Sequence, residues 1–178
     1  MQFTVFRPDE SVAVQLATAN ITCWRQAYAA IVPAEILAKA NLEEQSVKWK
    51  GILGDSDRVV FAATTMEGDV AGFVVAGRPT ENLVEGVDGH IAALYILAQF
   101  HRRGLGRLLL AAVAKDWLAR GGHSLSVGVL AENTQARHFY ESLGARLVRT
   151  STYEWDGHPL PDAIYMFEDI AELAALTP

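Results

Sequence analysis

The stretch His101-Arg102-Arg103-Gly104-Leu105-Gly106-Arg107 decides the fold, because this basic, glycine-containing turn opens a long segment with helical periodicity. The first amides of a helix have no intrahelical acceptors, and the helix dipole favours negative charge at that end. Glycines let an oxyanion approach the backbone closely, and the arginines would add charge-assisted hydrogen bonds. The turn is therefore predicted to bind phosphate groups.

Two nucleotide-binding motifs can be compared with this turn. A P-loop needs a Lys-Ser/Thr pair after its last glycine, where this chain has Arg107-Leu108. A dinucleotide-binding turn needs a third glycine, and Leu109 stands at that position. Neither motif fits the sequence.

The segments around the turn alternate between strand and helix patterns. Residues 90–97 form a β-favouring run, 104–120 an amphipathic helix that ends at Gly121-Gly122, and 124–130 a buried strand. Asn133 stands at the N-cap of a helix that ends before Gly144. Further strands are predicted at 2–7, 58–66, 70–77, 146–155 and 163–167, and helices after Asp9 and at 42–53. Loops are predicted at 78–89 and 156–162 and a tail from residue 169, all within one α/β domain covering 1–178.

The segment from His90 to Ala145 resembles the GNAT superfamily of acetyltransferases. The turn is similar to the family's R/Q-x-x-G-x-G/A motif, with His101 in place of the usual Gln or Arg. Residues 133–144, NTQARHFYESLG, are similar to its N-x-x-A-x-x-F-Y-x-x-x-G segment. The resemblance implies a mixed, mostly antiparallel sheet of about seven strands flanked by about four helices. The sheet would splay after the strand that precedes the turn.

The resemblance also implies which residues bind acetyl-CoA, the acyl donor. The strand before the turn would offer backbone groups to the pantetheine arm, the turn would hold the pyrophosphate, and Asn133 would touch the pantetheine. Tyr140 matches the tyrosine that donates a proton to the departing CoA thiolate, and the amine would attack the thioester directly. The implied donor-binding residues are Leu94, Tyr95, Ile96, Leu97, His101, Arg102, Arg103, Gly104, Leu105, Gly106, Arg107, Asn133 and Tyr140.

The attacking amine must lose a proton, because alkylamines are protonated at neutral pH. His90 is the candidate base, since it begins the strand before the turn, where relatives often carry a glutamate, and imidazole titrates near neutrality. A water chain leading to another base is the alternative. His90 could equally be a structural histidine that faces solvent or bonds to backbone.

Trp24 and Tyr28 belong to a stretch, WRQAYAAIVP, that resembles the W-x-x-A-Y-x-x-x-x-P pattern of one GNAT branch. In that branch this region borders the acceptor pocket, so both residues are candidate substrate contacts. Both could instead pack in the core. The acceptor itself is predicted only as a small-molecule or peptide amine.

Charge and cysteine content narrow the remaining classes. The formal net charge of −6 and the pI near 5.3 do not favour nucleic acid or an anionic membrane as partners. The single cysteine, Cys23, and the absence of a membrane-length apolar run predict a cytoplasmic protein. His123, His138 and His158 lack ligand-like spacing, so no metal is expected.

Three function classes and two oligomeric states remain open at this stage. The chain could be an N-acyltransferase, or it could bind acyl-CoA without turnover as a sensor or interaction module. The third class, a nucleotide phosphotransferase, would be protected against heat by ATP and not by CoA. A homodimer is possible.

Overall fold

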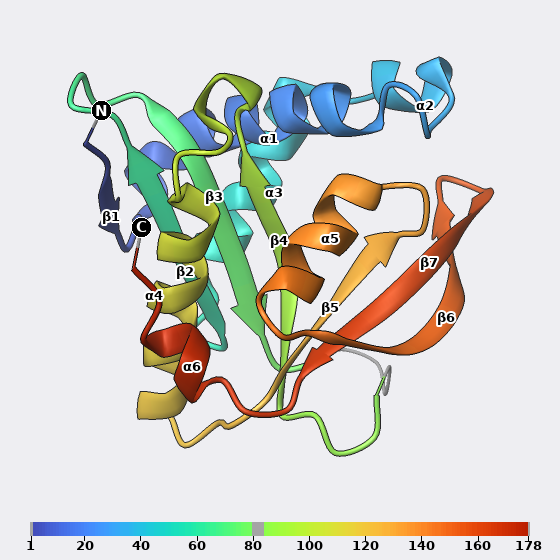
Figure 1. Ribbon diagram of the computed structural model, residues 1–178. Helices are drawn as coiled ribbons and strands as arrows, with labels where there is room; N and C mark the ends of the chain where they lie inside the picture. The colour runs from blue at the N-terminus through green and yellow to red at the C-terminus, as the bar shows by residue number, and fades with distance from the viewer. Residues whose placement is uncertain (1, 80–83, 178) are drawn as a thin grey trace.

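The computed structural model describes residues 2–79 and 84–177, and it builds them around a seven-stranded sheet with the order β1-β2-β3-β4-β5-β7-β6 (Figure 1). All neighbouring strands are antiparallel except β4 and β5, which are parallel and joined through a helical crossover. The strands are β1 (Thr4–Phe6), β2 (Arg58–Thr64), β3 (Val70–Gly77), β4 (Gly89–Ile96), β5 (Leu125–Leu130), β6 (Arg146–Trp155) and β7 (His158–Phe167).

Helices cover both faces of this sheet. In Figure 1, α1 (Ala13–Tyr28) and α3 (Leu42–Gly54) lie behind it, whereas α4 (Leu105–Ala119), α5 (Thr134–Ser142) and α6 (Ala171–Ala174) lie in front. The short α2 (Ala34–Ala38) follows α1, and two 3₁₀ turns, η1 (Glu10–Val12) and η2 (Ala98–Phe100), precede α1 and α4. The inner strand β3 is buried along its whole length. The expected mixed sheet of seven strands is thereby confirmed.

The feature that creates a site is the separation of β4 from β5. The two strands pair only from Gly89 opposite Leu125 to Ile91 opposite Val127. A register shift between β3 and β4 leaves Ala92 as an extra residue at the same point, and such a bulge bends a strand. Beyond it, the rest of β4 has no partner on this side, while β5 continues on its other side with β7. The predicted splay is confirmed.

Two details differ from the sequence prediction. Strand β7 begins at His158, so Pro159 and Pro161 lie in a strand and not in the expected loop. Both prolines pair with β6, at positions where β7 has not yet met β5, and proline is tolerated on such an open strand edge. The described residues form six α-helices and not about four, because α2 and α6 add short helices.

Tertiary burial explains the two additional helices. Each is five residues or shorter, too short for periodicity to reveal. Helix α2 buries Ile36 and Leu37, and α6 buries Leu173 in the core beside α4. Part of the predicted loop at 78–89, residues 80–83, lies outside the described residues.

Candidate active site

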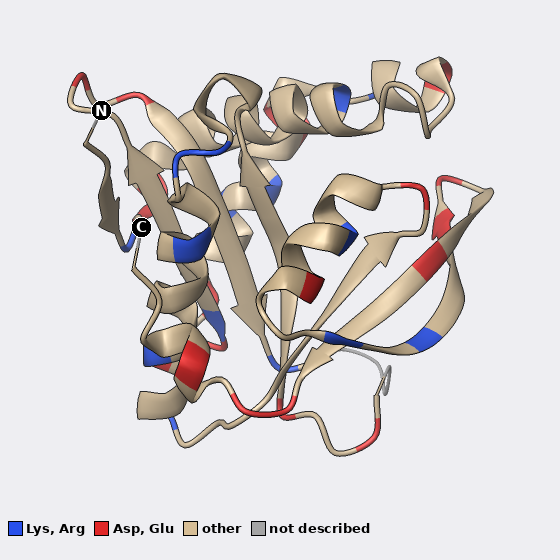
Figure 2. Ribbon diagram, in the orientation of Figure 1, with Lys and Arg blue, Asp and Glu red and all other residues tan. Residues whose placement is uncertain are grey.

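The basic turn leads into α4 as predicted. Gly104 is the N-cap residue with a φ of 78°, and Arg102 also has a positive φ, of 61°. Within the described residues no backbone carbonyl accepts from the amides of Leu105 and Gly106, and the first bond runs from Arg107 N to Gly104 O at 3.0 Å. Figure 2 shows this turn as a blue segment just before α4, so positive charge and open amides coincide. The turn therefore has the form of an anion site.

His101 fastens the turn to its surroundings. Its Nε2 atom lies 2.8 Å from the carbonyl oxygen of Ile96, and its Nδ1 atom lies 3.4 Å from Nε2 of Gln135. These partners require the ring proton on Nε2, because the Ile96 carbonyl can only accept and the Gln135 amide can only donate. The imidazole thus joins the end of β4 to α5.

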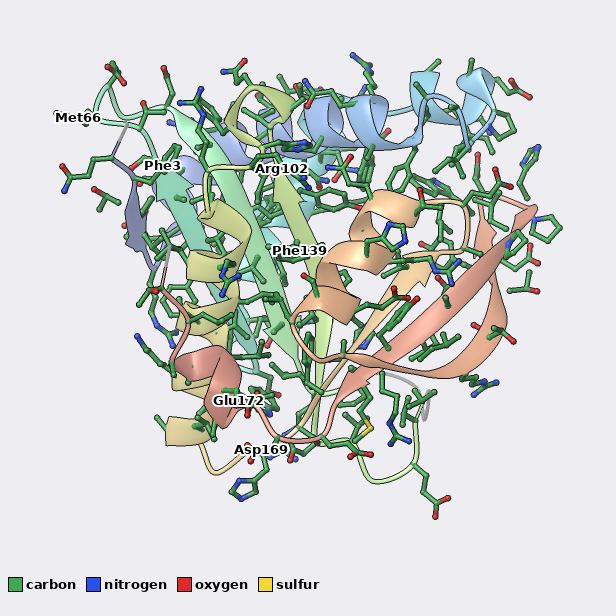
Figure 3. All side chains as sticks on the ribbon, in the orientation of Figure 1. Phe3, Met66, Arg102, Phe139, Asp169 and Glu172 are labelled. Carbon is green, nitrogen blue, oxygen red and sulfur yellow. The ribbon has the colours of Figure 1, made fainter. Side chains whose placement is uncertain are left out.

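A cleft of about 1000 Å³ extends from the turn, between the separated strands, to helix α1. In Figure 3, Arg102 at the start of α4 and Phe139 on α5 border its turn end. Twelve of the predicted residues line this cleft, Tyr28 on the acceptor side and eleven on the donor side. The eleven are Leu94, Tyr95, Ile96, His101, Arg102, Gly104, Leu105, Gly106, Arg107, Asn133 and Tyr140.

Gly106 sets the width of the cleft at its turn end. A Cβ atom at this position would stand 2.9 Å from Cζ of Phe139 and 3.3 Å from Cδ1 of Ile96, both tighter than ordinary contacts. A side chain here would push α5 away from the turn. The second glycine of the motif is therefore required by the close approach of α4 and α5.

Tyr140 is buried on α5, and its ring packs against Phe139 and Phe167 with centroid distances of 5.3 and 6.4 Å. Its hydroxyl has no hydrogen-bond partner among the described residues. Burial first, and then the nearby Tyr28, raises the pKa of the Tyr140 phenol above its ordinary value. The phenol therefore stays protonated near neutral pH and can donate a hydrogen bond into the cleft.

The helix that carries Tyr140 is fixed at several points. The Asn133 side chain accepts from the amide of Ala136 at 3.2 Å, which confirms the predicted N-cap. Nε of Arg137 donates to the Tyr165 hydroxyl at 2.9 Å, and that hydroxyl donates to Glu141 at 2.6 Å. This clamp holds α5 against β7.

His90 does not line the cleft. It lies where β4 and β5 are still paired, and its Nδ1 atom is 2.9 Å from Oγ of Ser126, directly across the strand pair. Burial, and then the charge of Arg58, lowers the pKa of His90 below its ordinary value, so the ring is neutral at neutral pH. The contact is with a side chain, and not with solvent or backbone as the structural alternative had it; the role of His90 as a base stays a prediction.

Of four further predicted contacts, one lines the cleft and three do not. Tyr28 lines the cleft, and its hydroxyl lies 3.0 Å from that of Tyr95. Trp24 does not line it and instead packs on Trp155, with ring centroids 5.5 Å apart. Leu97 and Arg103 do not line the cleft either. The Leu97 side chain packs against the main hydrophobic core.

The comparison with protein families decides the classification. The profile described as the acetyltransferase (GNAT) family matches residues 22–145, more than half of the chain. The chain belongs to the GNAT family. Its resemblance to GNAT acetyltransferases, first seen in the turn and in residues 133–144, is thereby confirmed.

Individual relatives agree with this classification. An uncharacterized N-acetyltransferase of Bacillus subtilis, YuaI, is 32% identical over 161 residues, which are 90% of each chain. The PaiA N-acetyltransferase of Thermoplasma acidophilum, solved with coenzyme A, has a TM-score of 0.72 at 16% identity, covering 94% of this chain and 99% of that one. The ribosomal-protein-S18-alanine N-acetyltransferase of Escherichia coli has a TM-score of 0.63 at 19% identity, covering 93% and 92%. These structures share the GNAT fold with this acetyltransferase family member.

One residue of this GNAT family member was missed by the sequence analysis. Asp162 lies on β7, in the region expected to be a loop, and its carboxylate stands beside Gly128, which lines the cleft. Because of its two prolines this segment was predicted as a loop. The alternation of side chains along a strand, which turns Asp162 toward the acceptor side, was therefore not predicted. Knowledge of the strand pairing with β5 would have been needed to find it.

Two searches of the described residues complete the picture of the site. They contain no group of three His, Cys, Asp or Glu side chains placed to hold a metal ion. Within the same residues, no helix combines the length and apolar character needed to cross a membrane.

Proposed function

We propose that this GNAT family member transfers an acetyl group from acetyl-CoA to a primary amine. The observation that carries the proposal is the meeting, in one cleft, of an anion-binding helix start and the buried phenol of Tyr140. The PaiA relative was solved in complex with coenzyme A, which supports acetyl-CoA as the donor.

The residues of the cleft suit coenzyme A from end to end. The amides of Leu105 and Gly106, with the guanidinium groups of Arg102 and Arg107, would hold the diphosphate. The unpaired edge of β4 offers alternating N–H and C=O groups to the amides of the pantetheine arm. The narrow contact of Gly106 with Phe139 closes the cleft beside the turn.

The donor supplies an acyl thioester that a neutral amine can attack directly. Tyr140 donates its phenolic proton toward the sulfur that leaves, and its raised pKa keeps that proton available. An open backbone amide of β4 can stabilise the oxygen on which negative charge develops. The protein thus contributes positioning, a proton donor and a dry cleft.

The test incubates purified protein and acetyl-CoA with a panel of amines and peptides and follows release of free CoA thiol. Acetyl transfer to at least one amine, with loss of release in Tyr140→Phe, supports the proposal. Calorimetric binding of CoA without thiol release for any acceptor would replace it with the sensor or interaction-module function. No binding of CoA at all would contradict both.

A further inference from the structure

Asp162 occupies a gap that the chain leaves open on the acceptor side of the cleft. A Cβ atom at Gly128 would lie 3.2 Å from Oδ2 of Asp162, so the carboxylate rests over the one residue of β5 without a side chain. Gly128 is exposed, whereas its neighbours on β5 are buried. Asp162 is not itself among the residues that line the cleft, but its carboxylate lies against Gly128, which does line it.

An aromatic wall adjoins this approach through Tyr28, which is the member of the wall that lines the cleft. It consists of Trp24 and Tyr28 from α1 with Tyr153 and Trp155 from β6. The ring centroid of Trp155 lies 5.5 Å from Trp24, 5.4 Å from Tyr28 and 6.1 Å from Tyr153, all in edge-to-face geometry. Tyr28 also lines the cleft and is close enough to Asp162 for the carboxylate to raise the pKa of its phenol, after burial and other causes.

The charge of Asp162 is not balanced by an ion pair with any described residue. Burial raises the pKa of Asp162 to about 6, although hydrogen bonds from the amides of Ala163 and Val129 and from Ser151 lower it. A half-buried carboxylate without a cationic partner costs stability, and such groups are typical of functional sites.

The other ionisable groups near this face are few. Tyr28 faces Asp162 from α1, and on β6 Arg149 and Tyr153 lie on the same face as Ser151, which pairs with Asp162. His90 lies further along this face, beside Ser126. His90 is the base expected from the sequence, so it must be tested beside Asp162.

We propose that Asp162 binds the ammonium group of the acceptor and removes its proton, and that the aromatic wall selects amines carried on an apolar body. This inference rests on the proposed acetyl transfer. A carboxylate beside aromatic faces is an arrangement that attracts a cation on an apolar stem. The same carboxylate repels an acceptor that carries its own carboxylate near the amine.

The proton and electron balance of the step is complete. The ammonium transfers one proton to Asp162, and the nitrogen lone pair forms the C–N bond while the C–S electron pair leaves with sulfur. Tyr140 protonates the sulfur, and the second proton of the nitrogen passes through water to restore the phenol. Asp162 then releases its proton to solvent, giving one amide, one free thiol and one proton.

The experiment compares the wild type with Asp162→Asn, using phenethylamine and phenylalanine as probes, which share the same ring and differ in the α-carboxylate. Glu154→Gln is the matched control, because Glu154 is an exposed carboxylate on β6 that alternates with the wall residues. His90→Gln tests the rival base. Each protein is measured for kcat/KM against pH, for phenethylamine affinity by tryptophan fluorescence in the presence of CoA, and for CoA affinity by calorimetry.

For the wild type, kcat/KM with phenethylamine should fall as the pH drops through about 6, because Asp162 becomes protonated. Asp162→Asn should lose about 100-fold or more of kcat/KM at neutral pH and lose this acid limb. Its phenethylamine affinity should fall at least about tenfold, with CoA affinity unchanged. Phenylalanine should be a much poorer acceptor, and Glu154→Gln should match the wild type.

If Asp162→Asn keeps both the acid limb of the kcat/KM profile and the affinity for phenethylamine, the inference is overturned. It is also overturned if the acid limb disappears in His90→Gln and not in Asp162→Asn. Equal use of phenethylamine and phenylalanine, or no binding of phenethylamine by the wild type, would overturn the substrate class. The CoA titration separates these results from failure of the proposed function, since loss of CoA binding by the wild type would contradict acetyl transfer itself.

Discussion

Replacing Tyr140 by phenylalanine removes one hydroxyl from the cleft and leaves the ring contacts with Phe139 and Phe167 in place. The hydroxyl has no hydrogen-bond partner among the described residues, so its loss strands no protein group. The free energy of unfolding should therefore change by less than about 1 kcal/mol. Loss of a general acid should lower kcat by about 10²–10⁴-fold, which corresponds to about 2.7–5.4 kcal/mol of activation free energy.

The matched control for this variant is Tyr165→Phe. The Tyr165 hydroxyl bonds to both Arg137 and Glu141, and Tyr165 is not among the residues that line the cleft. Its loss should lower the Tm while kcat falls far less than in the Tyr140 variant. The two tyrosines should thus give opposite patterns of activity and stability.

The assay follows thiol release with saturating acetyl-CoA and an accepted amine, alongside calorimetric titration with CoA and a thermal melt. Tyr140→Phe should keep the CoA affinity and the Tm of the wild type while kcat falls. A variant with undiminished kcat would refute the role of Tyr140 as proton donor. Loss of CoA affinity and of kcat in parallel would show that the residue shapes the cleft instead.

Three other substitutions test separate parts of the structure. Gly106→Leu should weaken CoA binding by about tenfold or more in calorimetry, because even a Cβ atom meets Phe139 at 2.9 Å; unchanged affinity would contradict the tight approach of α4 and α5. Trp155→Ala should raise the KM for the amine by about tenfold while CoA affinity is kept, since it removes part of the aromatic wall; an unchanged KM would exclude the wall from the acceptor site. Asp88→Ala should cost about 2 kcal/mol in chemical denaturation, because it strands Nε1 of Trp117. Burial raises the pKa of Asp88, but the hydrogen bonds to its carboxylate outweigh burial and leave the pKa lowered. The stabilisation by Asp88 is therefore present at neutral pH and is lost as the pH falls below the ordinary aspartate range. A stability difference between variant and wild type that does not depend on pH would contradict this assignment.

Local signals explain why the donor side could be predicted from the sequence. The open amides before α4, Gly104 at its N-cap and Asn133 at the N-cap of α5 depend on a few neighbouring residues. The spacing between these motifs is also fixed within one stretch of chain. The sequence could therefore identify the anion site and the helix that carries Tyr140.

The acceptor side depends on pairing between distant segments, which no local pattern reports. Asp162 comes next to Gly128, a residue of the cleft wall, only because β7 pairs with β5 and because Gly128 has no side chain. The parallel pairing of β4 with β5 likewise places His90 against Ser126 and away from the cleft. Prolines are found at open strand edges as well as in loops, and the prolines of β7 lie at such an edge. From the sequence they were interpreted as part of a loop.

The central claim is that the open amides at the start of α4 bind the diphosphate of coenzyme A, and a calorimetric titration of the purified protein with CoA tests it most directly. The account predicts saturable binding with one CoA per chain, and clear weakening when the salt concentration rises, because the site is an anion site. The same titration with Gly106→Leu should give much weaker binding. Absence of binding by the wild type, or equal binding by the variant, would contradict the account.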